Sequence, residues 1–217
     1  MMIALAGCDG AGKTTQVNRL VDWLSRAGRE PVVIDKRDIL RPDKLPECRF
    51  LDPDFPKLRA CVAEMNGPAR ALFWFWAIGI SLSRADFENQ ERVYLLDGYW
   101  MKQAAAEVVY GCDADWVLHV VSAFPKPDLT IYLDVSPEDA LARKTERTPY
   151  ECGRRGDLDA GAFLDHQGQV RSVLLEWCER FGWERLSTGG GADEVSVAVQ
   201  GLISARLYSS VSVFAAP

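Results

Sequence analysis

The chain has 217 residues, of which 48% are hydrophobic and 26% charged, and its formal net charge is -6. This length suffices for one buried α/β core with a small lid and is short for two enzyme domains, so we expect a single domain over residues 1–217. An acidic chain is poorly suited to bind a nucleic-acid polymer, because such surfaces are usually basic. The longest apolar stretch, residues 71–83, is too short to span a bilayer.

The six cysteines are scattered, without the spacing of a zinc site or the framework of a disulfide-rich secreted protein. We therefore expect reduced thiols and a cytoplasmic location. Residues 1–7 lack the basic segment of a signal peptide and run directly into a glycine-rich motif, which favours a first strand.

That motif, Gly7 to Thr14, reads GCDGAGKT and fits the pattern G-x-x-x-x-G-K-[ST]. The apolar run at 2–6 predicts a strand before it, and apolar residues at helical spacing over 15–24 predict a helix after it. The motif therefore predicts a cradle for nucleotide phosphates, and the alternative is a glycine-rich turn with a chance lysine.

Each residue type in the motif has a chemical reason. Gly7, Gly10 and Gly12 let backbone N–H groups turn toward phosphate oxygens, and the following helix presents its positive end to the same anion. Lys13 would reach the β- and γ-phosphates, and the Thr14 hydroxyl would hold Mg²⁺.

Strands and helices are expected to alternate along the rest of the chain. Further strands are predicted at 31–35, 92–97, 128–134 and 183–187, and helices at 57–65, 69–87, 102–110, 115–123, 137–147, 160–180 and 193–207. The helix over 69–87 is apolar almost all round and is expected to be buried. This alternation predicts a parallel sheet with its ligand at the carboxyl ends of the strands. Residues 40–56 are expected to form a surface connection and 208–217 a loosely held tail.

Two polar features could complete the site. Asp97 follows a buried strand, where it would hold Mg²⁺ or, alternatively, cap a turn. Asp134 ends another strand, but Ser136 begins a helix beside it, so a structural role is equally open. Residues 148–159 form a polar insert, which we expect to be a mobile lid that brings Arg154 and Arg155 to the phosphoryl group; a solvated basic turn is the alternative.

Several blocks together resemble the thymidylate kinase family of P-loop nucleoside monophosphate kinases. They are ALAGCDGAGKTTQ at 4–16, PDLTIYLDVSPEDALARKTER at 127–147 and, less closely, ALFWFWA at 71–77 and LDGYW at 96–100. The resemblance covers the chain in block order, with a divergent middle third. It implies a P-loop NTPase fold of three α/β/α layers with a five-stranded parallel sheet, ATP and Mg²⁺ as cosubstrates, and a homodimer.

The resemblance also implies roles at matching positions. Asp9 matches the carboxylate that contacts the acceptor sugar, Arg37 the arginine that grips the acceptor phosphate, and Phe73 the aromatic that stacks on the acceptor base. Arg143 matches the arginine that lies against adenine. The residues after Asp9 resemble the class whose lid supplies the catalytic arginine. From the residues alone, Phe73 is equally a core residue, and a solvated charge is the alternative for each of the two arginines.

The chain departs from the family on the acceptor side. The family's Asp-Arg-Tyr is here Asp97-Gly98-Tyr99, so an arginine for the acceptor phosphate is absent and Lys102 is a candidate substitute. Ala77 stands where the family places a base-reading arginine. Tryptophans at 74, 76 and 100 either reshape the pocket or belong to the core.

ATP is expected to contact Gly7, Asp9, Gly10, Ala11, Gly12, Lys13, Thr14, Thr15 and Arg143. The acceptor is expected to contact Asp9, Arg37, Phe73, Tyr99 and Lys102. Catalysis is assigned to Lys13, Asp97, Arg154 and Arg155, and metal binding to Thr14 and Asp97.

These residues predict transfer of the γ-phosphoryl group of ATP to a nucleoside monophosphate, dTMP or a related pyrimidine nucleotide. The alternatives are a kinase acting on a nucleoside or modified nucleotide, and a non-catalytic nucleotide-binding regulatory protein. A lid with arginines favours an enzyme, since a protein that only binds nucleotides does not need them.

Overall fold

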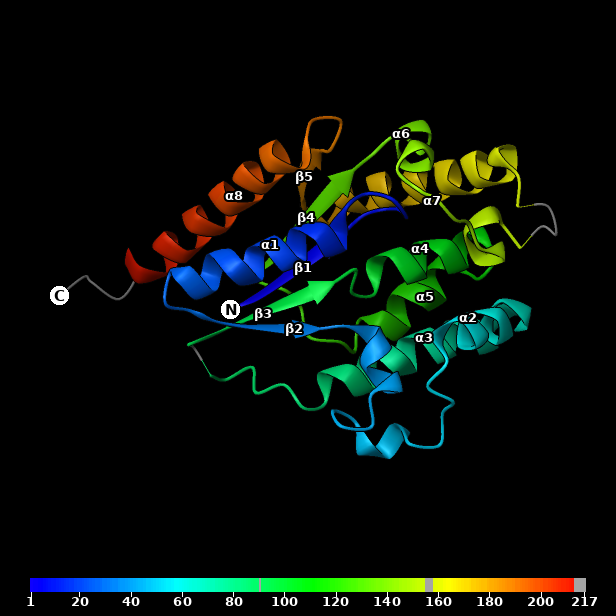
Figure 1. The fold of residues 1–217 in the computed structure, drawn as a ribbon, viewed down its shortest axis with the longest axis horizontal. Helices are drawn as coiled ribbons and strands as arrows, with labels where there is room; N and C mark the ends of the chain where they lie inside the picture. Colours follow the sequence, from blue (N-terminus) through cyan, green and yellow to red (C-terminus); the bar gives the residue numbers. More distant parts are fainter. Residues whose placement is uncertain (90, 155–157, 213–217) are drawn as a thin grey trace.

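The computed structural model describes residues 1–89, 91–154 and 158–212, with only the backbone for the last five of these. A five-stranded, all-parallel sheet forms its centre, in the order β2-β3-β1-β4-β5. The strands are β1 (Met2–Ala6), β2 (Glu30–Ile34), β3 (Arg92–Asp97), β4 (Leu129–Asp134) and β5 (Glu184–Ser187). This sheet, with helices on both faces, confirms the predicted P-loop NTPase α/β fold (Figure 1).

The helices divide between the two faces of the sheet. In Figure 1, α1 (Lys13–Arg26) and α8 (Ala192–Ser212) lie together on one face, while α4 (Met101–Val109) and α7 (Ala160–Phe181) pack together on the other. The remaining helical segments are α2 (Phe55–Glu64), α3 (Gly67–Leu82), α5 (Ala114–Val121), α6 (Pro137–Ala142) and the short 3-10 turns η1 (Lys36–Leu40), η2 (Pro46–Cys48) and η3 (Pro149–Cys152).

Apolar patterning explains the core. Every residue of β1 and of β4 is buried, as expected for central strands covered on both faces. Helix α1 buries Val17, Leu20 and Leu24 at the predicted helical spacing. Ser136 caps α6 as predicted, because its side chain accepts a hydrogen bond from the Asp139 backbone N–H at 3.0 Å.

Several predicted boundaries were wrong. Helix α3 ends at Leu82 and not at 87, and α6 ends at Ala142 and not at 147. The second strand begins one residue earlier than predicted, and α8 continues to Ser212 through the segment predicted as a loose tail. No Gly or Pro stands between residues 202 and 212 to end that helix.

The expectation that α3 is buried on all sides was also wrong. Leu72 is 48% exposed and Trp76 38% exposed, because the neighbouring segments η1, α2 and α4 cover only part of the helix circumference. All six cysteines are free thiols. Among the described residues, no helix has the length and apolar character needed to cross a membrane.

Candidate active site

The GCDGAGKT segment joins the carboxyl end of β1 to the start of α1. Gly7 and Gly10 adopt φ of 153° and 85°, and a Cβ at either residue would lie 2.8 Å from a backbone carbonyl oxygen. Glycine is therefore required at both positions. The Lys13 ammonium folds back over the loop and donates hydrogen bonds to the carbonyl oxygens of Gly7 at 2.9 Å and Cys8 at 2.7 Å.

The neighbouring strand brings a carboxylate to this loop. Thr14 Oγ1 donates a hydrogen bond to Asp97 Oδ2 at 2.6 Å, and Arg37 Nη2 lies 3.6 Å from the same oxygen. Strands β1 and β3 are adjacent and parallel, so their carboxyl ends meet at one edge of the sheet. Gly98 follows with φ of 77°, and a Cβ there would lie 3.4 Å from Lys13 Cε. An arginine at this position would be strained in this backbone conformation.

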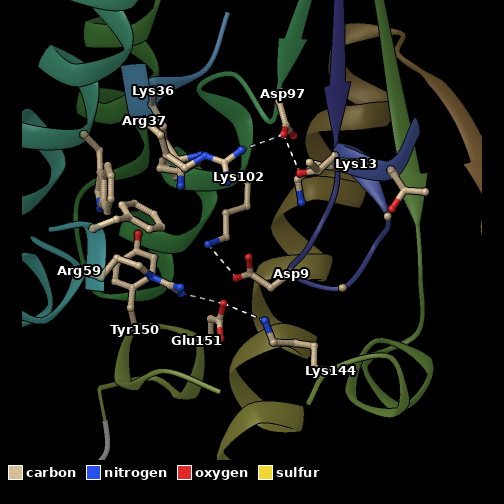
Figure 2. A pocket seen from close by; sticks show the side chains of 17 residues that line it. Asp9, Lys13, Lys36, Arg37, Arg59, Asp97, Lys102, Lys144, Tyr150 and Glu151 are labelled. Atoms are coloured by element: carbon tan, nitrogen blue, oxygen red, sulfur yellow. Dashed lines mark hydrogen bonds and ion pairs between the residues drawn. The ribbon is translucent and has the colours of Figure 1, made fainter. Parts of the chain in front are cut away.

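A cavity of about 350 Å³ opens beside the loop (Figure 2). Six cationic and three anionic side chains line it, an excess of three positive charges in a chain whose net charge is -6. The cationic residues are Lys13, Lys36, Arg37, Arg59, Lys102 and Lys144, and the anionic ones are Asp9, Asp97 and Glu151. This concentration of positive charge is suited to a polyanionic ligand.

Lys102 and Asp9 form an ion pair inside the cavity, with Nζ 2.8 Å from Oδ2 (Figure 2). Burial acts to raise the pKa of the Asp9 carboxyl, but the charges of Lys102 and Lys13 outweigh it and hold that pKa far below its usual range. Asp9 is therefore ionised at neutral pH. For Lys13, burial lowers the pKa of the ammonium, and this effect outweighs the charges of the nearby carboxylates, which act to raise it.

Glu151 is shared by two cations that come from separate segments of the chain. Its Oε1 lies 3.0 Å from Arg59 Nη2, on α2, and 3.0 Å from Lys144 Nζ, just after α6. Figure 2 shows the two cations approaching the carboxylate from opposite sides. One buried carboxylate balances only one of these charges, so the cluster retains a positive charge toward the cavity.

Arg143, predicted to lie against adenine, contacts the phosphate loop. Its guanidinium donates hydrogen bonds to the Gly10 carbonyl oxygen at 3.5 Å and to Thr188 Oγ1 at 3.4 Å. It therefore links the phosphate loop to the segment after β5. Gly12, Thr14 and the following Thr15 line the cavity, whereas Ala11 is buried behind the loop.

Besides Gly7, Ala11 and Arg143, three predicted site residues, Phe73, Tyr99 and Arg154, do not line the cavity. Phe73 packs between Trp74 and Trp76, with ring centroids at 5.5 Å and 6.1 Å, and Trp74 takes the cavity wall instead. Successive residues of a helix point about 100° apart, so a one-residue shift changes the face. The Tyr99 side chain is buried elsewhere, and its hydroxyl donates a hydrogen bond to the Pro125 carbonyl oxygen at 2.9 Å.

Arg154 is the third of these residues. Its guanidinium donates a hydrogen bond to Asn66 Oδ1 at 2.8 Å, between α2 and α3. The φ of Arg154 is 60°, in the left-handed region. Arg155 lies outside the described residues. Residues 148–154, the first part of the expected lid, pack against the rest of the protein, since Tyr150 and Glu151 are both buried.

Several cavity residues were missed by the sequence reasoning. These are Lys36, Phe55, Arg59, Gln103, Lys144, Tyr150 and Glu151. Trp74, one of the tryptophans expected either to reshape the pocket or to belong to the core, lines the cavity. The position of Lys36 just after a predicted strand was a usable signal, whereas Arg59 and Glu151 reach the site only through the packing of α2 and η3.

The parallel sheet, the phosphate loop and the cationic cavity define a P-loop nucleotide-binding protein. No protein-family model matches the chain. The thymidylate kinase of Chlorobium phaeobacteroides is 31% identical over an alignment of 192 residues that covers 81% of each chain. Probable thymidylate kinases of Methanobrevibacter smithii and Archaeoglobus fulgidus are 24% and 28% identical over 92% and 81% of each chain.

The chain therefore belongs to the thymidylate kinase family. It is an enzyme of the nucleoside monophosphate kinase class. The resemblance inferred from the phosphate loop and the strand before Ser136 is confirmed at the level of the family.

Proposed function

We propose that the enzyme transfers the γ-phosphoryl group of ATP to the 5′-phosphate of a pyrimidine nucleoside monophosphate, dTMP or a close relative. The observation that carries this proposal is the excess of three cations around a cavity that adjoins the phosphate loop. A donor and an acceptor phosphate that meet in one site need such a surplus of positive charge. The names of the relatives support thymidylate as the acceptor.

The phosphate loop forms the donor half of the proposed site. Backbone N–H groups of the loop and the Lys13 ammonium would hold the β- and γ-phosphates, and Arg143 would lie against adenine. For Lys13 this means exchanging its two carbonyl hydrogen bonds for phosphate oxygens.

Thr14 and Asp97 fit a magnesium ion. Their oxygens are hard ligands, lie 2.6 Å apart and border the cavity. When bound, Mg²⁺ would neutralise charge on the phosphate oxygens. Asp97 also lies 3.6 Å from Arg37, so the same carboxylate would contact the metal ion and a cation of the acceptor half.

The acceptor half contains the two cations that the sequence analysis assigned to it. Arg37 and Lys102 would bind the acceptor phosphate, with Lys102 replacing the arginine that is absent at Gly98. The ionised Asp9 would accept a hydrogen bond from a sugar hydroxyl. Asp9, Arg37 and Lys102 all line the cavity in this structure.

The charge that stabilises the moving phosphoryl group is proposed to come from Lys144. It lines the cavity near Asp9, whereas the Arg154 side chain contacts Asn66. Arg155 remains a predicted second source. A single domain, a homodimer and a cytoplasmic location also remain predictions.

A turnover screen with ATP tests the proposal. Nucleoside monophosphates and the corresponding nucleosides are offered separately, and formation of ADP and of phosphorylated product is measured. Phosphorylation of dTMP or another pyrimidine monophosphate is expected. The missing arginine at Gly98 favours a second candidate, a kinase for a nucleoside or modified nucleotide, which activity on nucleosides alone would establish. Tight ATP binding without turnover of any acceptor would indicate a regulatory protein.

A further inference from the structure

A buried glutamine joins the phosphate loop to the segment that carries Glu151. The amide oxygen of Gln167 accepts a hydrogen bond from the Asp9 backbone N–H at 3.2 Å, and its amide nitrogen donates one to the Glu151 carbonyl oxygen at 3.0 Å. Asp9 lies in the loop after β1, Glu151 in η3 and Gln167 on α7. One side chain of α7 therefore connects two segments that are far apart in the sequence.

The surroundings of Gln167 are those of an apolar side chain. It is 1% exposed and stands at helical spacing with the buried Phe163, Val170 and Leu174 on one face of α7. Leucine or methionine would fill such a position, and burying an amide gives up its hydrogen bonds to water. Both ends of the Gln167 amide are paired, which offsets that cost. The two hydrogen bonds, and not the packing, account for a glutamine here.

The two groups that Gln167 holds belong to different parts of the proposed site. Asp9 is fixed twice, since Gln167 binds its backbone and the Lys102 ammonium lies 2.8 Å from its carboxylate. Glu151 holds the proposed catalytic cation, with Lys144 Nζ 3.0 Å from its Oε1. Gln167 thus links the loop that would bind the ATP phosphates to the residue that orients Lys144.

We propose that Gln167 is a positioning residue for phosphoryl transfer, which sets the separation between the phosphate loop and Lys144 through its hydrogen bonds to Asp9 and Glu151. This inference rests on the proposed function. Gln167 is not among the cavity-lining residues, so it acts through these two partners. Phosphoryl transfer depends on positioning and charge stabilisation, and a displacement of about 1 Å can lower a rate about 10²-fold.

Gln167→Met tests the inference, because methionine has a similar length and removes both hydrogen bonds. The kcat and the KM values for ATP and for dTMP are measured well below the melting temperature, which is determined separately. We expect kcat to fall at least about tenfold while both KM values change less than about threefold, since the substrates still bind but the catalytic cation is displaced. A residue with only a structural role would lower the melting temperature and leave the kcat of the folded enzyme unchanged.

Gln167→Glu adds a readout that a loss of stability does not produce, and it does not depend on the folding of the first variant. A protonated carboxyl has the shape of the amide, so its O–H can donate to the Glu151 carbonyl and its C=O can accept from the Asp9 N–H. An ionised carboxylate cannot donate, and it would place a second negative charge beside Asp9.

Burial and the charge of Asp9 raise the pKa of the introduced carboxyl. The ratio of kcat for Gln167→Glu to kcat for the wild type should therefore rise at least about fivefold as the pH is lowered from about 8 to about 5.5. Other titrating groups, among them Asp9, Glu151 and the neighbouring His166, are common to both proteins, so their own titration cancels in this ratio.

Gln169 provides the matched control, since it lies two residues further along α7 and is exposed. Gln169→Met and Gln169→Glu should keep the wild-type kcat, with a ratio to the wild type that does not change with pH. An active enzyme in which Gln167→Met keeps the wild-type kcat, or in which the ratio for Gln167→Glu does not rise in acid, would overturn this inference and leave the proposed function intact. A wild-type protein that phosphorylates no acceptor would overturn both.

Discussion

Lys102→Met gives a quantitative test of the cavity, because Lys102 combines an ion pair with a proposed role toward the acceptor. Its ammonium lies 2.8 Å from Asp9 Oδ2, and the two side chains are 8% and 20% exposed. At an effective dielectric constant of about 20, this separation corresponds to an attraction of about 6 kcal/mol before desolvation is subtracted.

The net loss should be smaller than that attraction. Removing one partner of a buried ion pair costs about 3–5 kcal/mol, mostly because the other charge is left uncompensated. Asp9 keeps some exposure and retains Lys13 as a second cation, so we expect Lys102→Met to lower the unfolding free energy by about 2–3 kcal/mol at pH 7. Urea denaturation measures this loss.

The loss should depend on pH. The pKa of Asp9 is lowered in the folded state, so its contribution to stability is complete above the ordinary value of 3.8 and disappears as the pH falls through the folded value. Without Lys102 the folded pKa of Asp9 rises. The difference in stability between wild type and variant should therefore be largest above pH about 4 and shrink in more acidic solution.

Lys57→Met is the control for the loss of a lysine in an ion pair. Lys57 Nζ lies 2.6 Å from Asp52 Oδ2, but both side chains are largely exposed, so no measurable loss is expected. In the double variant Asp9→Asn/Lys102→Met, stability should recover partly while kcat/KM for the acceptor stays at least about 10²-fold low. If Lys102→Met behaves like Lys57→Met in both stability and turnover, the assigned roles of Lys102 are wrong.

Four further predictions concern single residues. Lys13→Ala should abolish turnover without a large change in melting temperature, and wild-type activity would contradict the assigned phosphate cradle. Asp97→Asn should raise the Mg²⁺ concentration needed for half-maximal rate at least about tenfold, and an unchanged Mg²⁺ titration would remove it from the metal site. Lys144→Met should lower kcat about 10²-fold while Arg154→Ala changes it little, and the reverse order would return catalysis to the arginine. Arg70→Met should lower the unfolding free energy by about 3–5 kcal/mol in urea denaturation, because the fully buried Glu107 carboxylate, 2.8 Å from Arg70, would lose its cation. A loss below about 1 kcal/mol would refute this.

Most of the fold could be predicted from sequence because its signals are local. The apolar runs of β1, β3 and β4 and the phosphate loop each lie within a few residues, and the structure has them where they were expected. Helix ends were less predictable, since no Gly or Pro directly follows the end of α3 or of α6.

The donor side of the site was predictable for the same reason. Lys13, Thr14 and Asp97 follow directly from a motif and a strand end, and the structure brings them together. The acceptor side depends on how α2, α3 and η3 pack over the sheet. No local pattern reveals that Arg59 and Lys144 meet on one carboxylate, or that Trp74 and not its neighbour Phe73 faces the cavity.

The most direct test of the proposed reaction follows the phosphoryl group itself. The enzyme is incubated with γ-labelled ATP, Mg²⁺ and dTMP, and the labelled products are separated. We expect the label in the β-phosphate of dTDP, with no transfer by the Lys13→Ala variant. Label found only in inorganic phosphate, or transferred to thymidine but not to dTMP, would contradict the proposal.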